Sequence, residues 1–349
     1  MTTNELLIEI IIPNWNGEAL LADCLRSLKK QTVRCFSVTV IDNGSEDNSL
    51  EMVHNTFPEV KTLTFDHNTG FSVAVNYGIE ASSAPWLLLL NNDMEIAEDC
   101  LEKLLDAIQK YDEYDFFALK MMNFHKRSYI DGAGDAVLRG GVGYRLGTME
   151  QDTPYYTEDR DCFGACAGAA LYKREFFQQI GTFDPDFFAY LEDVDLNMRA
   201  NRAGLRCRFI ASATVFHIGS ASSGSKINAF TVRLSTRNNI YILLKNYSLL
   251  LFLRFLPAII VYQFMWMAFC CKKGMIFPYI VGIFQAVRSS LPQLKKKRHL
   301  LKKENCIEQK TFASMISASE REAVTSIMNR RAASGKSNFF FNCYTRLFL

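Results

Sequence analysis

The chain has 349 residues, of which 49% are hydrophobic and 22% are charged, so it can hold one large domain or two ordinary ones with a substantial core. The formal net charge is only +2 and none of the usual nucleic-acid-binding motifs occurs, so we expect no nucleic-acid partner. Ten cysteines are scattered without Cys-x-x-Cys spacing, which indicates neither a zinc site nor a disulfide framework.

The first 90 residues alternate between strand and helix patterns. Strands are predicted over 6–12, 36–41, 60–65 and 86–90, and helices over 19–30, 47–55 and 71–81. We expect Pro13 to end the first strand, because proline has no amide hydrogen to give to a sheet. Strands that alternate with helices are typical of a parallel sheet with helices on both faces, so an α/β fold is predicted.

Polar loops follow three of these strands. They are Asn14-Trp15-Asn16-Gly17, Asp42-Asn43-Gly44-Ser45 and Asn91-Asn92-Asp93. Because the carboxyl ends of parallel strands share one edge of a sheet, we expect these loops to form a ligand crevice. The turn at Asn68-Thr69-Gly70 and the nearby Asn76 could also face an anionic or polar ligand. Ordinary turn chemistry is the alternative for each of these loops.

The middle of the chain has a different pattern. Residues 112–181 are rich in glycine, which predicts strands and loops, and we interpret this stretch as facing the acceptor. A helix is predicted over 195–203, and two short strands over 206–210 and 214–216 end at His217.

Three acids, Glu192, Asp193 and Asp195, directly follow an aromatic run at 183–188. Apolar neighbours raise the pKa of a carboxyl group and suit it to act as a general base. The alternative is that these acids only open a helix, where negative charge favours the helix dipole.

Two apolar stretches, 255–271 and 275–287, lie near the end of the chain, and each is shorter than the roughly 20 residues that a spanning helix needs. Basic residues border both, and positions 295–303 hold six positive charges. We expect in-plane attachment to an anionic membrane surface, because a transmembrane hairpin would carry Lys272 and Lys273 to the far side. The alternative is a pair of core or subunit-contact helices.

Six motifs occur in a fixed order within residues 6–245. They are Ile11-Ile12-Pro13-Asn14-Trp15-Asn16-Gly17, the Asp42 turn, Asn68-Thr69-Gly70, Asn91-Asn92-Asp93, Gly181-Thr182-Phe183-Asp184 and Glu192-Asp193-Val194-Asp195-Leu196. Together they resemble the family 2 glycosyltransferases, especially the rhamnosyltransferase-like branch of bacterial polysaccharide assembly. The resemblance implies the glycosyltransferase A fold, which is Rossmann-like with a mostly parallel central sheet. It also implies an inverting transfer from a nucleotide-diphosphate sugar.

The resemblance places a divalent ion, Mg²⁺ or Mn²⁺, on Asp93, where it would bridge the diphosphate. Asn91 stands where the family's Asp-x-Asp motif has its first acid, so one carboxylate of the motif remains. His217 matches a histidine that ligates the metal in some members, although a lone histidine is more often structural.

The resemblance also makes Asp193 the catalytic base and places Glu192 and Asp195 on the acceptor side. Asp195 is the rival for the role of base, but it could instead pair with Arg199 one helical turn later. Asp42 matches the acid that contacts the nucleotide base. Further nucleotide-sugar contacts are expected at Pro13, Asn14, Asn16, Asn68, Gly70, Asn76, Asn91 and Asn92.

The predicted organisation is a catalytic domain over 1–245, membrane-associated helices over 246–303, and a C-terminal helix and tail over 304–349. Within the catalytic domain, about 1–111 would bind the nucleotide sugar and about 112–245 would supply the acceptor side and the base. Truncation before Leu249 should then release a soluble catalytic domain.

The expected function is sugar transfer to a saccharide or lipid-linked acceptor in cell-surface polysaccharide biosynthesis. The protein would work at the cytoplasmic face of the inner (cell) membrane as a peripheral or monotopic protein. One alternative is a catalytically impaired membrane-bound scaffold, suggested by Asn91. Another is a sugar-nucleotide pyrophosphorylase, although the loop after the first strand lacks the basic residues of that class.

Overall fold

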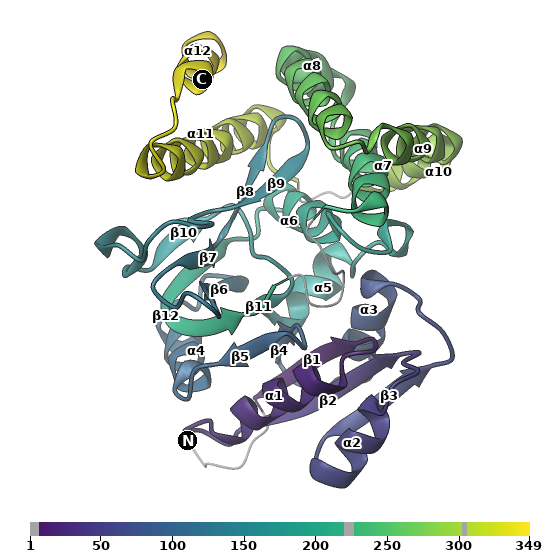
Figure 1. Cartoon of the computed structure of the whole chain (residues 1–349), viewed down its shortest axis with the longest axis vertical. Coiled ribbons are helices and arrows are strands. Elements are labelled where there is room, and N and C mark those ends of the chain that lie inside the picture. Colours follow the sequence, from purple (N-terminus) through teal and green to yellow (C-terminus); the bar gives the residue numbers. More distant parts are fainter. Residues whose placement is uncertain (1–6, 220–226, 302–305) are drawn as a thin grey trace. The chain divides into compact units, whose positions relative to one another are not determined.

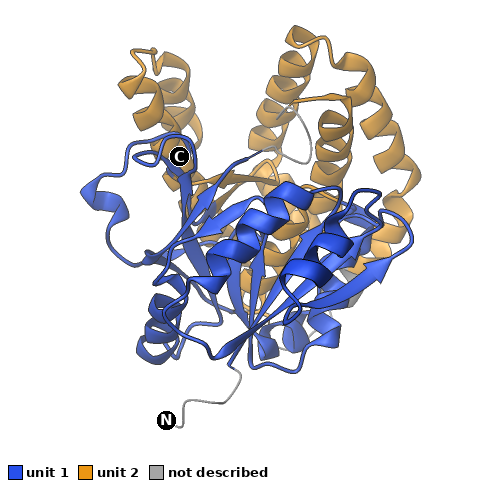
Figure 2. Cartoon of the chain, turned by 60° about the horizontal axis from the view of Figure 1, so that its bottom comes forward, with its two compact units in different colours: residues 1–135, 147–188, 205–224 blue, residues 136–146, 189–204, 225–349 orange. Residues whose placement is uncertain are grey.

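The computed structural model describes residues 7–219, 227–301 and 306–349, without the side chains of 297–301. The chain forms two compact units (Figure 2). The first comprises residues 1–135, 147–188 and 205–224, and the second comprises residues 136–146, 189–204 and 225–349. The strand start predicted at residue 6 and the basic residues Lys302 and Lys303 lie outside the described residues.

The first unit contains one sheet of ten strands (Figure 1). Its parallel half has the order β3-β2-β1-β4. These strands are β1 (Ile8–Asn14), β2 (Phe36–Asn43), β3 (Lys61–Phe65) and β4 (Trp86–Leu90), connected through α1 (Glu18–Lys29), α2 (Ser49–Thr56) and α3 (Phe71–Ala81). The strands and helices predicted for the first 90 residues are confirmed, with ends shifted by no more than two residues.

Alternate side chains of β1 face helices on opposite sides of the sheet. Ile10 and Ile12 belong to a core cluster that includes Leu25 of α1. Ile11 faces α3, and Gly78 of that helix lies so close that a Cβ there would be 2.5 Å from Ile11 Cγ2. Because helices cover both faces, Ile10, Ile11 and Ile12 are all buried, and the acid of this strand, Glu9, accepts hydrogen bonds from Ser37 and Thr39 of β2.

The prediction that Pro13 ends the first strand is wrong, because β1 continues to Asn14. Pro13 lies opposite Ile41 of β2, whereas the pairing of β1 with β4 stops at Ile11. The missing amide hydrogen therefore falls where β1 has a neighbour on one side only, a position at which a sheet tolerates proline.

The other half of the sheet makes it mixed. The strand β11 (Ala169–Lys173) runs antiparallel between β4 and β6 (Phe116–Asn123), and β12 (Cys207–His217) runs parallel to β6. The two strands predicted before His217 are this one strand, with a register shift between Ile210 and Thr214. The unit is completed by β5 (Met94–Ile96), α4 (Cys100–Lys110), β7 (Ile130–Ala133), β10 (Arg160–Cys162) and α5 (Arg174–Ile180).

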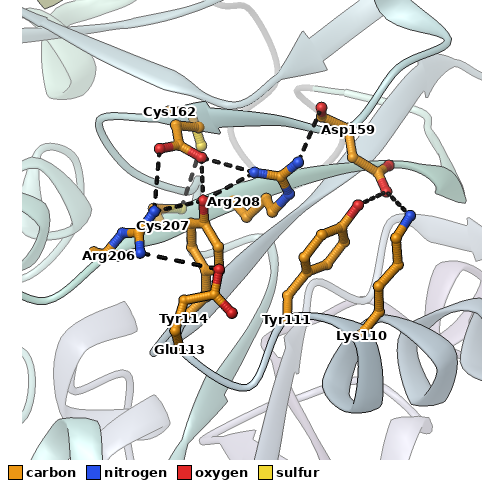
Figure 3. Close-up of polar contacts among 10 residues, drawn as sticks. Lys110, Tyr111, Glu113, Tyr114, Asp159, Cys162, Arg206, Cys207 and Arg208 are labelled. Carbon is orange, nitrogen blue, oxygen red and sulfur yellow. Dashed lines mark hydrogen bonds and ion pairs between the residues drawn. The ribbon is translucent and has the colours of Figure 1, made fainter.

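A polar cluster fixes the edge strand β10 to β12 (Figure 3). Arg208 donates hydrogen bonds to the Tyr114 hydroxyl at 2.9 Å and to Asp161 Oδ1 at 2.8 Å. Cys162 lies opposite Cys207 with the Sγ atoms 3.3 Å apart, and both are free thiols. The edge strand is thus held by charge-assisted hydrogen bonds, which are stronger than neutral ones.

The second unit combines a β-hairpin with helices. The hairpin is β8 (Asp135–Leu138) and β9 (Val142–Arg145), and the helices are α6 (Glu192–Arg202), α7 (Ala229–Asn246), α8 (Leu249–Lys272), α9 (Ile276–Arg288), α10 (Ser290–Leu301), α11 (Gln309–Ala333) and α12 (Phe339–Phe348). The domain boundary expected after 245 falls in the last turn of α7.

The helix α11 is part of the core of this unit, where the sequence predicted a helix and a loose tail. Ser319 accepts a hydrogen bond from the Val137 amide at 2.8 Å, and Glu320 forms a buried ion pair with Arg139. Ala323 packs with Ala136 and Leu146 around the hairpin. The segment after residue 304 therefore supplies packing that the hairpin needs.

The helix α8 is longer than the apolar stretch that the sequence indicated. It has 24 residues, which at 1.5 Å per residue span about 36 Å, and it is long and apolar enough to cross a membrane. The expectation that this segment is too short is therefore wrong, because the helix begins at Leu249 and includes Arg254.

Candidate active site

Three loops at the carboxyl ends of β1, β2 and β4 are hydrogen-bonded to one another. Asn92 donates from Nδ2 to Asn14 Oδ1 at 2.7 Å, and Asn14 donates from Nδ2 to Asp42 Oδ1 at 3.3 Å. Asp42 Oδ2 accepts from the Ser45 amide at 3.0 Å. The structure thus brings the predicted polar loops together at one edge of the sheet.

This amide network requires glycine at position 17. A Cβ on Gly17 would lie 2.3 Å from Asn92 Nδ2 and 2.8 Å from Asn14 Oδ1. Asn16 is exposed, accepts from the Glu46 amide through Oδ1 at 2.7 Å, and has a left-handed φ of 48°. The first and second loops are therefore held together while Asn16 stays accessible to a ligand.

Asp42 is buried, with both of its oxygens in this network. Pro13, one residue before Asn14, is partly exposed. Asn91 packs closely on Gly168, where an added Cβ would lie 2.9 Å from the side-chain nitrogen of Asn91. In this conformation Asp42 fixes the loops in place through its two oxygens.

The turn after β3 is fixed by β2. Asn68 Oδ1 accepts from Asn43 Nδ2 at 3.1 Å and from the Gly70 amide at 2.9 Å, so its carbonyl oxygen holds the turn. Asn76 exchanges two hydrogen bonds with the backbone of Phe183, at 2.8 and 2.9 Å. Asn76 therefore positions the Gly181-Thr182-Phe183 loop in the same unit.

Asp93 and His217 meet because β5 pairs with β12. His217 lies opposite Met94 in this antiparallel pair, and the Ile218 amide donates to the Asp93 carbonyl at 3.1 Å. His217 Nε2 lies 3.3 Å from Asp93 Oδ2, and both side chains are buried. The structure thus joins the two predicted metal ligands.

Asp131 of β7 completes this group, and the sequence reasoning missed it. Its Oδ2 lies 2.7 Å from His217 Nδ1, so it fixes the ring orientation and leaves Nε2 toward Asp93. A carboxylate on the second ring nitrogen is the usual partner of a metal-binding histidine. No spacing in the sequence links Asp131 to His217, because the contact depends on β7 lying beside β6.

The Asp93–His217 pair fits a divalent cation. Asp93 Oδ1 is buried and has no hydrogen-bond partner among the described residues. A buried carboxylate oxygen without a partner is costly unless a cation or water satisfies it. One carboxylate and one imidazole form a mixed oxygen and nitrogen set, which suits Mn²⁺ better than Mg²⁺.

In the second unit, Glu192 and Asp193 lie in the first turn of α6, which begins before the predicted start at 195. The backbone enters this helix through Tyr190 and Leu191, whose φ values of 69° and 67° are strained for residues other than glycine. Asn238 of α7 donates hydrogen bonds from its amide group to the carbonyls of Ala189 at 2.9 Å and Tyr190 at 2.7 Å. α7 therefore holds the strained turn that presents Asp193.

Glu192 and Asp193 differ in exposure. Glu192 is buried, its Oε2 has no hydrogen-bond partner among the described residues, and burial together with the charge of Asp193 raises its pKa to about 8. Asp193 is partly exposed, and its Oδ1 accepts from the Val194 amide at 2.8 Å. Asp193 is the more accessible of the two.

Asp195 is fully buried in an ion network. It pairs with Arg199 at 2.9 Å, as the spacing of one helical turn predicted, and with Lys245 of α7 at 2.9 Å. Burial alone would raise the pKa of Asp195, but Lys245 and Arg199 overcome that effect and hold it well below its usual range. Asp195 therefore joins α6 to α7 and is not available as a base in this conformation.

Comparison with known proteins identifies the domain that contains these loops. Residues 9–181 match the model of the family described as Glycosyl transferase family 2. The N-acetylglucosaminyl-diphospho-decaprenol L-rhamnosyltransferase of Mycobacterium tuberculosis is 28% identical over 221 residues, which cover 57% of this chain and 72% of that protein.

Two solved structures share the fold. GalNAc-T7 with UDP, GalNAc and Mn²⁺ has a TM-score of 0.55 at 20% identity, covering 69% of this chain and 48% of that chain. S. aureus TarS 1–349 has a TM-score of 0.53 at 15% identity, covering 93% of this chain and 92% of that chain. The glycosyltransferase A fold expected from the motifs is confirmed, and the chain carries a domain of glycosyl transferase family 2 over residues 9–181.

Proposed function

We propose that this glycosyltransferase moves a sugar, with inversion, from a nucleotide-diphosphate donor to a saccharide or lipid-linked acceptor in cell-surface polysaccharide biosynthesis. The observation that carries the proposal is the Asp93–His217–Asp131 group beside the Asn14–Asn92–Asp42 network in a family 2 domain. The rhamnosyltransferase relative makes rhamnose the first sugar to test, and its name makes a lipid-diphosphate saccharide the first acceptor.

A divalent ion would be held by Asp93 and His217, with Mn²⁺ favoured by the nitrogen ligand. When bound, such an ion neutralises charge on a diphosphate leaving group. Asp131 keeps the His217 ring in place, and the joined loops after β1, β2 and β4 hold the nucleotide sugar with Asn16 at the exposed edge.

Asp193 is the proposed base, which takes the proton of the acceptor hydroxyl on a carboxylate oxygen as that hydroxyl attacks the anomeric carbon. Its partial exposure and the strained turn before it support this role, because strained backbone is retained mainly where function requires it. Burial and the charge of Asp193 raise the pKa of Glu192 to about 8, so Glu192 is mostly protonated near neutral pH and does not compete for the role of base.

We also propose that α8 lies in the plane of an anionic leaflet instead of crossing it. Side chains such as Leu253, Ile260 and Phe264 are 55–64% exposed. Another side of α8 is hydrogen-bonded to α7, because Gln263 donates to Asn239 at 2.5 Å and Trp266 donates to Thr236 at 2.8 Å. A spanning α8 would carry the polar α7 into the bilayer, which is costly.

The test of the donor site is isothermal titration of the full chain with Mn²⁺ in the presence of dTDP- or UDP-sugars. We expect metal-dependent donor binding that Asp93→Ala abolishes and His217→Ala weakens, with a matched change at the exposed Asn48→Ala as the control. Donor binding and transfer that persist in excess EDTA would contradict the metal-dependent mechanism.

The test of the base is Asp193→Asn. Transfer into a lipid-linked acceptor should fall by a factor on the order of 10² or more, while donor affinity stays unchanged, because the amide keeps the shape but cannot take a proton. Normal turnover of the Asp193→Asn variant would assign the role of base to another group.

The unmodified chain also tests the scaffold alternative suggested by Asn91. If it binds donor but transfers no sugar from any donor, that alternative is favoured.

A further inference from the structure

The helix α12 follows α11 near the C-terminus (Figure 1). Its apolar side chains form an inner stripe that contacts α11 and an outer stripe that is exposed. The inner stripe, Phe341, Tyr344 and Phe348, is partly buried, and the Tyr344 hydroxyl donates to Glu320 Oε1 of α11 at 2.7 Å. The outer stripe includes Phe340 and Leu347, which are 46% and 76% exposed. Both stripes repeat at helical spacing, so the outer one is a continuous apolar face and not a set of isolated side chains.

This outer face is large for a helix of ten residues. Phe339, at the start of the helix, is 76% exposed beside Phe340. No residue of α12, all of which the structure describes, is buried. At about 15 Å the helix is too short to span a bilayer, so its apolar face can only lie along a surface.

The charge around α12 indicates which surface it fits. Residues 323–349 contain Arg330, Arg331, Lys336 and Arg346 and no acidic residue. An apolar face bordered only by positive charge is complementary to the headgroups and acyl boundary of an anionic bilayer. A symmetric contact with a second copy would instead bring four positive charges against four others, and like charges repel.

We infer that α12 is a membrane-binding helix that lies in the plane of an anionic phospholipid bilayer. Phe339, Phe340 and Leu347 enter the acyl boundary, and Arg346 with the basic residues at the end of α11 contacts the headgroups. This inference goes beyond the in-plane role proposed for α8 and does not require it. Two separate segments would hold the protein more firmly than either alone, since one weak anchor gives only reversible attachment.

The experiment is hydrogen exchange, read by mass spectrometry, on the full chain with phosphatidylcholine vesicles that do or do not contain phosphatidylglycerol. This readout separates α12 from α8, because each segment gives its own peptides. We expect amides of 339–348 to exchange about tenfold more slowly with the anionic vesicles and to be little changed by the neutral ones.

The double variant Phe340→Ser/Leu347→Ser should lose this slowing at 339–348, while Asn342→Ser, at an exposed polar position of the same helix, should keep it. Slowing at α12 without slowing at α8 would support this inference and overturn the role proposed for α8. Unchanged exchange at 339–348 with anionic vesicles would overturn the inference. So would slowing that needs only higher protein concentration and no lipid, because a second copy would then cover the face.

Discussion

Asp131 acts on the candidate metal site through His217, and this indirect role can be tested. Asp131→Asn replaces an oxygen acceptor with an amide that can present either polar end to His217 Nδ1, so the ring orientation and basicity are no longer fixed. Loss of such a partner typically weakens metal binding 10–100-fold. Titration with Mn²⁺ should show this loss with thermal stability nearly unchanged. The surface variant Asp106→Asn is the control, and equal affinities in both variants would contradict the assignment.

Glu192 gives a prediction about pH. Its pKa is about 8 in the folded chain, against an ordinary value of 4.5, so between these pH values only the folded state holds the proton. Raising the pH through this window therefore removes stability that the protonated carboxyl contributes. Glu192→Gln should raise the melting temperature more at pH 8 than at pH 5. Thermal melts at pH 5 and pH 8 check this prediction, with Glu46→Gln at an exposed position as the control. If Glu192→Gln changes the melting temperature equally at both pH values, the prediction is wrong.

At the scale of residues, the sequence located groups whose partners are local and missed those whose partners are distant. Asp195 pairs with Arg199 one turn away, which spacing predicts, but Lys245 joins the same carboxylate from α7. Motifs in the sequence identified Asp93 and His217, whereas the contact of Asp131 with His217 depends on the pairing of β6 with β7. A contact set by sheet topology leaves no periodic signal along the chain.

At the scale of elements, the turn before α6 depends on α7. Asn238→Ala removes two donors to the Ala189 and Tyr190 carbonyls, so the left-handed conformations of Tyr190 and Leu191 lose their support. On the proposal that Asp193 is the base, kcat should fall roughly tenfold while KM for the donor stays the same. Steady-state kinetics on the purified full chain measure both constants.

A second substitution separates positioning from folding. Leu191→Gly in the Asn238→Ala background should recover part of kcat, because glycine adopts positive φ without strain. Recovery of the melting temperature without recovery of kcat would show that Asn238 serves stability only. If Asp193→Asn is itself fully active, the proposal for the base fails, and this experiment then reports only on the turn.

Element prediction succeeded where periodicity was complete and failed where another part of the chain decided the ends. The helix predicted over 71–81 and the strand over 86–90 match α3 and β4, because each has a clear apolar pattern and a clear boundary. α8 begins earlier than its uninterrupted apolar run, since Ser248 caps the helix by accepting from the Leu251 amide at 3.1 Å. A helix continues through Arg254 when its carbon stem can lie along the surface.

At the scale of the whole molecule, the chain order of the predicted parts differs from the way the units are built. The second unit takes the hairpin at 136–146 and the α6 segment at 189–204 from the middle of the chain and joins them to residues after 225. Composition changes along a sequence show where apolar and basic segments begin. They do not show that a hairpin near residue 140 needs a helix near residue 320, because that pairing is a tertiary contact.

This arrangement changes the expected result of truncation before Leu249. Such a chain would lose α11, and with it Glu320, which pairs with the buried Arg139, and Ser319, which binds the Val137 amide. Removing one partner of a buried ion pair costs about 3–5 kcal/mol, and the uncovered Ala136 and Leu146 add to that cost. We therefore expect the chain that ends at residue 248 to aggregate or to melt well below the full chain.

The matched control is a chain that ends at residue 338, which removes only α12. Since no residue of α12 is buried, this chain should keep its fold and its donor affinity. Glu320→Gln in the full chain isolates the ion pair, and its melting temperature should lie between those of the two truncated chains. Soluble fraction, thermal melts and donor titration measure all three. A chain ending at residue 248 that stays monomeric, melts near the full chain and binds donor normally would contradict this expectation, because α11 would then not be needed for a stable fold.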